Sequence, residues 1–344
     1  MAKSIVLSSG SILCGSPIII SVTPTTVNER STFHRVKLEI SVALSTDSSF
    51  ETYTQSAKAD NGEDVIFDVS SALRSVFSRY VYDYQVEDRT YPYLIYTLKA
   101  YDEYMLDGIL NEKVGEMEYG ARLYALIGQF TEIERYLSAA NKGVQKFSRK
   151  PSVGEVCAAD ELLLYPTPLG ELALMGTVIS TGQVVKAYAL SELSGKQIFE
   201  GHSVYVIPPS RNRIQFQFVN KLGVVESISA EMRESLSYET TSETDTVSVA
   251  GSFRPNRRIL SRKGAKQQVY AMSSGVVNQD WADWWVNEFL DCEKGSWVKF
   301  DGIWIPCEVI PEDTISVYDK STNGLCQINF NVRLALTGGF RNRL

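Results

Sequence analysis

Histidine is scarce in this sequence, which contains only His34 and His202. A zinc site built on histidines, or a Ser-His-Asp triad, therefore has very little to draw on. The five cysteines are odd in number, widely spaced and without a C-x-x-C pair, which predicts reduced thiols made in a cytosol rather than a disulfide framework. We expect neither a metal ion nor a cofactor, and we interpret both histidines as ordinary core or surface residues.

Enzyme signatures are absent as well. The chain has no P-loop, no G-x-G-x-x-G after a strand, no H-E-x-x-H, no G-x-S-x-G and no EF-hand loop. Close carboxylates such as Asp160 with Glu161, or Glu243 with Asp245, are expected by chance among 41 acidic residues, and a glycosidase pair needs a cleft in the fold. We therefore predict no catalytic residues and no enzymatic activity.

Long apolar runs and a signal-peptide pattern are also missing, so we expect no membrane span and no export by the usual route. The net charge of −7 argues against a protein that binds nucleic acid over its whole surface. Any such binding would have to be local.

Short strand patterns dominate the sequence. With 344 residues, 44% of them hydrophobic, the chain is long enough for two folded domains. The predicted fold class is mainly β, with two β-sandwich-like domains and a few short helices. We predict an N-terminal β-rich domain over residues 1–140, a basic linker over 141–154 and a C-terminal β-rich domain over 155–344.

The first domain has clear local signals. Apolar residues alternate with polar or small ones over residues 36–42, which predicts a strand with one face on a core. Asn61-Gly62 predicts a hairpin turn between the strand-like runs on either side. Helical spacing predicts a helix within residues 120–140. Ser70 is expected to cap another short helix, whose apolar side carries Leu73, Val76 and Phe77.

The second domain carries similar signals. Hairpins are predicted at Asp301-Gly302 and near Asn323-Gly324. A helix over residues 279–291 is expected to pack its aromatic side on a sheet through Trp281, Trp284, Trp285 and Phe289. The final strand is expected to place on one face Cys326, Ile328, Phe330, Val332, Leu334 and Leu336.

Tyrosine is abundant, with 18 residues, and such amphipathic rings are favoured at protein interfaces. Tyr91, Tyr93 and Tyr96 could form a platform that stacks on sugars, or simply one face of a sheet. The sugar platform supports an alternative hypothesis, in which the protein is a carbohydrate-binding module that recognises a host surface.

A basic stretch without acidic residues follows an acidic, Thr-rich run that contains Glu239, Glu243 and Asp245. The stretch could be a solvated loop, a local nucleic-acid site or an assembly surface, on which neighbouring copies in a ring meet acid to base. The basic stretch has no interleaved aromatic residues on which nucleic-acid bases could stack, so we favour the assembly surface. The candidate interface residues are Arg254, Arg257, Arg258, Arg262, Lys263 and Lys266.

The segment "FVNKLGVVE" fits the pattern F-x-N-x-x-G-x-x-E through Phe218, Asn220, Gly223 and Glu226. This pattern resembles tail proteins of siphophages, particularly those of Bacteroidetes hosts. Two further features resemble these proteins. One is "GSPIIISVTP" followed by "VIFDVSSALRS", and the other is the C-terminal order of basic stretch, Trp-rich helix, D-G hairpin and alternating strand.

The resemblance implies a structural virion protein at the tail tip, such as a distal-tail or baseplate protein. Such a protein is expected to form a homo-oligomeric ring, with a hexamer as the candidate copy number, and to connect the tail tube to tip proteins or fibres. It would be synthesised in the host cytoplasm and end in the virion tail.

Overall fold

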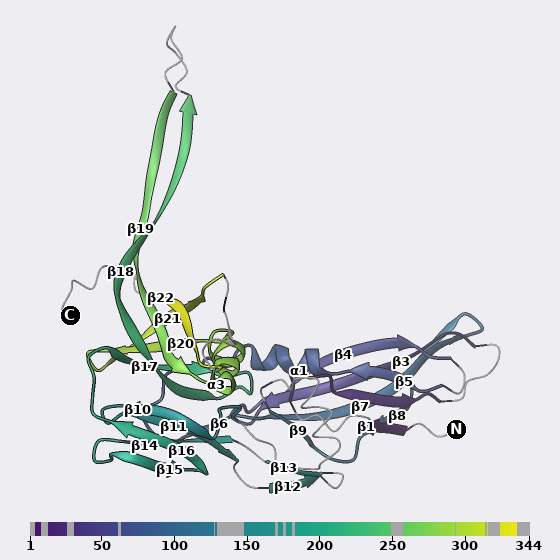
Figure 1. The fold of residues 1–344 in the computed structure, drawn as a ribbon. Helices are drawn as coiled ribbons and strands as arrows, with labels where there is room; N and C mark the ends of the chain where they lie inside the picture. The colour runs from purple at the N-terminus through teal and green to yellow at the C-terminus, as the bar shows by residue number, and fades with distance from the viewer. Residues whose placement is uncertain are drawn as a thin grey trace.

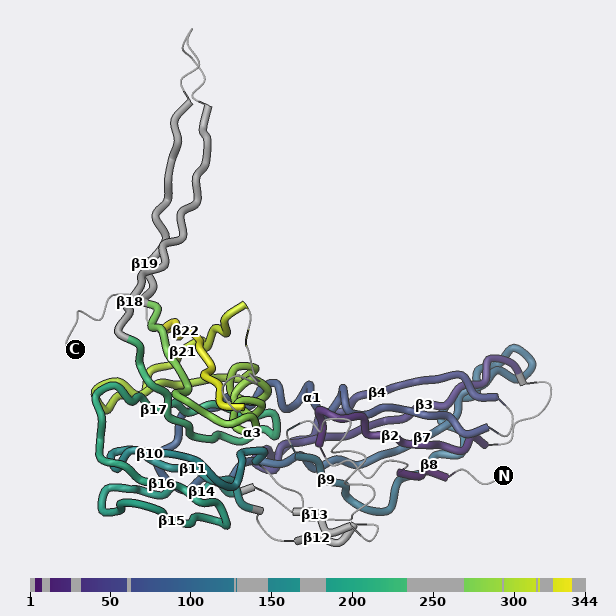
Figure 2. The backbone as a smooth tube through the Cα atoms, in the orientation of Figure 1, coloured from purple at the N-terminus to yellow at the C-terminus, as the bar shows by residue number. Residues whose placement is uncertain are grey.

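The structure is a computed structural model that describes residues 4–7, 13–25, 31–60, 63–126, 128, 148–168, 171–174, 177–180, 183–248, 257–292, 294–313, 315 and 324–335. Within these residues the chain is mainly β with few short helices, as predicted. Figure 2 shows two parts side by side, an elongated N-terminal part and a second part built of small sheets and a barrel. No helix in the described ranges is both long enough and apolar enough to cross a membrane.

The N-terminal part packs two antiparallel sheets and one helix around a common apolar core (Figure 1). Residues 36–42 confirm the predicted alternation, because Val36, Leu38, Ile40 and Val42 are all fully buried. One sheet has the order β4-β3-β7-β8, with β9 also paired to β7, and the other has the order β1-β2-β5. The elements are β1 (Ser4–Leu7), β2 (Ile19–Thr23), β3 (Ser31–Leu44), β4 (Glu51–Lys58), β5 (Val65–Asp68), α1 (Ser70–Phe77), β7 (Leu94–Leu106), β8 (Ile109–Glu118) and β9 (Leu123–Ala125).

The hairpin predicted around Asn61-Gly62 is wrong. Strand β4 pairs with β3, whereas β5 pairs with β2, so the two flanking strands lie in different sheets. The two turn residues themselves lie outside the described residues. A turn signal in sequence reports the local chain reversal and does not fix which strands then pair.

Helix α1 lies where it was predicted, and Leu73, Val76 and Phe77 are buried. The side chain of Ser70, however, does not cap it. The Asp68 carboxylate accepts the Ser70 backbone N–H at 3.0 Å instead, and also the Ile18 N–H at 3.1 Å. One carboxylate therefore satisfies a free donor of the helix and ties it to the chain entering β2.

The helix predicted within residues 120–140 is wrong at its start, because Leu123–Ala125 form strand β9. Residues 127 and 129–147 lie outside the described residues, and the first half of the predicted linker falls within this undescribed range. Its described end, 148–152, is irregular, and β10 begins at Val153.

Small sheets form the lower layer of the second part (Figures 1 and 2). Their orders are β10-β16-β15 and β11-β14-β6, and β12 pairs with β13 as a separate hairpin. Strand β6 falls within the range predicted for the N-terminal domain, yet it pairs with β14. The strands are β6 (Arg89–Tyr91), β10 (Val153–Ala158), β11 (Leu162–Pro168), β12 (Glu171–Leu174), β13 (Thr177–Ser180), β14 (Gln183–Ala189), β15 (Gly195–Phe199) and β16 (His202–Ile207).

A closed barrel with the order β17-β18-β19-β22-β21-β20 forms the upper layer. The turn at Asp301-Gly302 joins β20 to β21 as predicted, with positive φ at both residues. In the last strand Ile328, Phe330, Val332 and Leu334 are buried as predicted, whereas Asn323 and Leu336 lie outside the described residues. The strands are β17 (Arg213–Val219), β18 (Val225–Ser248), β19 (Arg257–Val277), β20 (Ser296–Phe300), β21 (Ile303–Pro311) and β22 (Cys326–Leu334).

The predicted Trp-rich helix is confirmed as α3 (Gln279–Trp284), which continues as a π-helical turn, η1 (Trp285–Phe289). The Asn278 side chain caps it by accepting the Trp281 N–H at 3.1 Å. Trp281, Trp284, Trp285 and Phe289 are all buried in the barrel core, where they meet Phe216, Phe218 and Phe330. These rings meet mostly edge to face, which is a favourable arrangement for aromatic pairs.

Candidate functional site

The two longest strands, β18 and β19, extend beyond the barrel as a two-stranded arm (Figure 1). Strand β18 pairs with β17 only up to Glu231, and β19 pairs with β22 only from Val269 onward. Within the described chain, residues 236–248 and 257–268 pair only with each other. We call these residues the arm. At about 3.3 Å per residue, the arm is roughly 40 Å long.

The arm contains both the acidic run and the basic stretch. Its register places Glu243 opposite Arg262 and Asp245 opposite Leu260. Of the candidate interface residues, Arg257, Arg258, Arg262, Lys263 and Lys266 lie on β19, and Arg254 lies outside the described residues. The acidic strand and the basic strand are therefore neighbours within one hairpin, an arrangement that the sequence order alone did not reveal.

Both long edges of the arm lack a neighbouring strand among the described residues. An isolated two-stranded hairpin is only marginally stable in water, and a strand edge presents backbone N–H and C=O groups to any further strand. An arm of this length is therefore suited to bind another chain along its edges.

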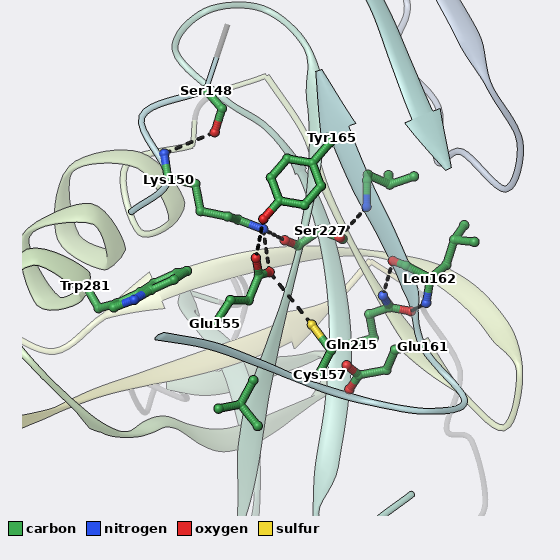
Figure 3. A network of polar contacts seen from close by, with 12 residues as sticks. Ser148, Lys150, Glu155, Cys157, Glu161, Leu162, Tyr165, Gln215, Ser227 and Trp281 are labelled. Carbon is green, nitrogen blue, oxygen red and sulfur yellow. Dashed lines mark hydrogen bonds and ion pairs between the residues drawn. The ribbon is translucent and has the colours of Figure 1, made fainter. Parts of the chain in front are cut away.

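A buried polar cluster lies beside the barrel portion of β18 (Figure 3). The Lys150 ammonium, which has no solvent exposure, contacts the Glu155 carboxylate at 2.6 Å and donates to the Ser227 backbone carbonyl at 2.6 Å. The Tyr165 hydroxyl donates to the other Glu155 oxygen at 2.8 Å. Lys150 thus joins the irregular segment before β10 to the first residues of β18, which belong to the barrel.

The charges in this cluster affect one another. Burial favours the neutral form of the Lys150 amine and so lowers its pKa. The negative charges of Glu155 and Glu226 have a larger, opposite effect, and the pKa of Lys150 is raised. Burial raises the pKa of the Glu226 carboxyl to about 7, against the opposing effect of Lys150. The rings of Tyr165 and Trp284 lie about 5.4 and 5.6 Å from the Lys150 ammonium, so cation–π contacts complete its surroundings.

The residues of the F-x-N-x-x-G-x-x-E pattern build the turn between β17 and β18. Phe218 is in the barrel core. The Asn220 side chain accepts the Leu222 and Val224 N–H groups at 3.0 and 3.1 Å, and Gly223 has a φ of 82°, which favours glycine. Glu226 then enters the polar cluster. Each position of the pattern therefore has a structural role in connecting β17 to β18.

The alternative in which Tyr91, Tyr93 and Tyr96 form a platform that stacks on sugars is wrong. Tyr91 and Tyr96 are each only 2% exposed, so neither can present a ring face to a sugar. Tyr91 donates its hydroxyl to the Gln85 side chain at 3.1 Å, whereas Tyr96 belongs to the N-terminal core. Tyr93 is half-buried and contacts the Tyr124 ring. The chain also leaves β6 after Tyr91 and enters β7, which lies in a different sheet, at Leu94.

The remaining residues that the sequence singled out have structural surroundings. Glu161 accepts the Ala158 N–H at 2.8 Å, beside the exposed Asp160. His34 lies 3.4 Å from the Asp102 carboxylate, and the His202 ring packs on Tyr165. All five cysteines are free thiols. No group of three or more His, Cys, Asp or Glu side chains suitable for a metal ion occurs in the described part of the chain.

Comparisons of the chain with protein families, with curated proteins and with solved structures gave no match.

Proposed function

We propose that this protein is a non-enzymatic structural component of a siphophage tail, in which copies form a ring at the tail tip or baseplate. The ring, with a hexamer as the candidate copy number, would connect the tail tube to tip proteins or fibres. The protein would be made in the host cytoplasm and act in the virion. The observation that carries this proposal is the arm.

The arm gives a specific geometry for assembly. Its two strands are antiparallel, with acidic residues on β18 and basic residues on β19. When the β18 edge of one copy lies beside the β19 edge of the next, the added strand is again antiparallel, and the acidic run meets the basic stretch. Such a head-to-tail contact uses two different surfaces, so it propagates around a ring and closes when the rotation allows.

Backbone pairing and charge have separate tasks in this arrangement. Hydrogen bonds along the strand edges supply affinity, as in other cases of strand addition. Attraction between unlike charges steers the encounter and fixes the register, and salt screens it over roughly 8–10 Å. Assembly is therefore expected to weaken as the salt concentration rises.

The charge contribution can be tested with one quadruple variant. Replacing Arg257, Arg258, Arg262 and Lys263 with serine is expected to weaken oligomer formation in light scattering, and to leave the melting temperature nearly unchanged. A matched variant replaces four exposed basic residues elsewhere, Lys58, Arg122, Lys196 and Arg211. It has the same net charge and is expected to assemble like the unmodified protein.

A nucleic-acid role for the basic stretch has a distinct signature. If the quadruple serine variant assembles normally but loses tight binding to DNA at physiological salt, the assembly role of these residues is wrong. We expect the unmodified protein to bind DNA only weakly and without sequence preference under the same conditions.

A further inference from the structure

A cleft of about 580 Å³ lies where four separate segments of the chain converge. The irregular segment after α1 supplies Tyr84 and Val86, and the β20–β21 hairpin supplies Ile303 and Trp304. The turn between β10 and β11, which includes Asp160, and the end of β14 complete the lining. This cleft is separate from the arm and from the polar cluster.

Aromatic rings form one wall of the cleft. The rings of Tyr84 and Trp304 are nearly parallel, with 23° between their planes and 6.2 Å between their centroids. The Lys299 ammonium lies 5.9 Å from the centre of the Trp304 ring. Tyr84 is 40% exposed, and its apolar neighbours Val86 and Ile303 are 60% and 57% exposed. The wall is thus apolar, aromatic and open to solvent.

The aromatic wall is held firmly although Tyr84 belongs to an irregular segment. Gln85, the next residue, is buried and exchanges two hydrogen bonds of 2.7 Å with the Gln217 side chain. The side-chain amide of Gln85 donates to the Val185 backbone carbonyl at 2.9 Å. Tyr84 and Val86 flank this anchor, so the backbone on both sides of Gln85 is fixed before any ligand arrives, which lowers the entropy cost of binding.

Polar groups surround the wall. Asp160 and Ser191 are exposed at the cleft, and the Lys299 ammonium is 3.3 Å from the Asp160 backbone carbonyl. Apolar ring surfaces with a few polar groups at the margin suit a ligand that has one apolar face and hydroxyl groups around its edge. A hexopyranose ring has this shape, because its axial C–H groups form a face that stacks on an aromatic ring.

We propose that this cleft binds a glycan, with one hexopyranose ring stacked on Tyr84 and its hydroxyl groups bonded to Asp160 and Ser191. The volume of about 580 Å³ suits a short oligosaccharide better than a folded partner. This site goes beyond the proposed structural role, since it gives each protomer its own contact with a saccharide surface.

The test uses the full-length protein on an array of neutral and amino-sugar oligosaccharides, followed by titration calorimetry with the strongest probe. Tyr84→Ala is expected to weaken binding at least tenfold, and Asp160→Asn is expected to weaken it severalfold. Tyr205→Ala is the matched control, because Tyr205 is 54% exposed but lies on β16 outside the cleft. It is expected to bind like the unmodified protein.

Two results would overturn the glycan site. One is the absence of saturable binding to every oligosaccharide at millimolar concentration. The other is equal affinity of the Tyr84→Ala variant and the unmodified protein for the best probe. Melting temperatures of the variants show that each is folded. Because the cleft is complete within one protomer, the glycan proposal can fail without affecting the ring proposal. Likewise, a protein that forms no ring can still be tested for glycan binding.

Discussion

Gln85 and Gln217 bind each other through reciprocal hydrogen bonds across 132 residues of sequence. The Gln85 N–H donates to the Gln217 side-chain oxygen, and the Gln217 side-chain amide donates to the Gln85 carbonyl, both at 2.7 Å. Both residues are buried. An irregular segment can run through the interior only when its backbone groups find such partners, so this pair fixes the N-terminal part of the chain to the barrel.

Replacing Gln217 with leucine keeps the side-chain volume but leaves the Gln85 N–H and C=O groups buried without partners. We expect the free energy of unfolding to fall by about 3 kcal/mol, since each such group costs about 1–3 kcal/mol. Urea denaturation measures the loss. Gln197→Leu is the control, because Gln197 lies on β15 and its amide makes a local, exposed bond to the Ser194 carbonyl, and it should cost less than about 1 kcal/mol. Equal losses in the two variants would contradict the role given to the pair.

The Lys150–Glu155 pair should be sensitive to removal of one partner. Lys150→Met leaves the Glu155 carboxylate buried without its ammonium, which typically costs about 3–5 kcal/mol. The Lys186–Glu200 pair has a similar separation of 2.7 Å but is far more exposed. Lys186→Met should therefore cost less than about 1 kcal/mol. Similar costs for both lysine variants in chemical denaturation would show that burial does not control the strength of the pair.

Glu226 should make stability depend on pH. Its pKa is raised to about 7 in the folded protein from an ordinary value of 4.5. The folded state therefore binds a proton that the unfolded state has lost between about pH 4.5 and 7, so stability falls as the pH rises through this window. Glu226→Gln removes the titrating carboxyl, and with it this fall in stability at higher pH. The variant should be more stable than the unmodified protein at pH 8, by on the order of 3 kcal/mol, and the difference should shrink toward pH 4.5.

Denaturation midpoints between pH 4.5 and 8.5 check this prediction. Glu63→Gln, at an exposed position, controls for the loss of one negative charge. A stability difference between Glu226→Gln and the unmodified protein that stays constant over the whole range would refute the linkage.

Trp285 tests the barrel core. It is 1% exposed, and its ring contacts those of Trp284, Phe289 and Phe330. Trp285→Ala should cost about 3–5 kcal/mol and give poorly soluble protein. Trp304→Ala is a useful comparison, because Trp304 is only partly buried at the edge of another cluster and should cost less. An unchanged melting temperature for Trp285→Ala would place this ring outside the core.

Local patterns predicted local structure well. The alternation over residues 36–42, the Asp301-Gly302 turn and the aromatic spacing of the Trp-rich helix each depend on neighbours in sequence, and each was confirmed. Strand pairing was harder, because β4 and β5 look like a hairpin and yet join different sheets. The pairing depends on which apolar faces share a core, and a local signal does not contain that information.

The candidate sites show the same limit. The charges of the arm were visible in sequence, but their register was not, because it depends on how β18 and β19 pair. The polar cluster was missed entirely, since Lys150 falls in a predicted linker and contacts Ser227, 77 residues away. Gln85 and Gln217 resemble ordinary surface glutamines in sequence. Gln217 alternates with Phe216 and Phe218 along β17, which predicts an outward-facing side chain, and Gln85 lies outside any strand, so no local pattern indicated that the two residues meet.

Shortening the arm tests the structural proposal most directly. Residues 239–267 are replaced by Asn-Gly, which joins the paired residues Tyr238 and Gln268 through a two-residue hairpin turn and leaves the barrel strands intact. Mass photometry and negative-stain microscopy at low salt should show rings for the unmodified protein and monomers for the shortened one, with similar melting temperatures for both. Monomers of the unmodified protein at every concentration, or equal rings from both proteins, would contradict assembly through the arm.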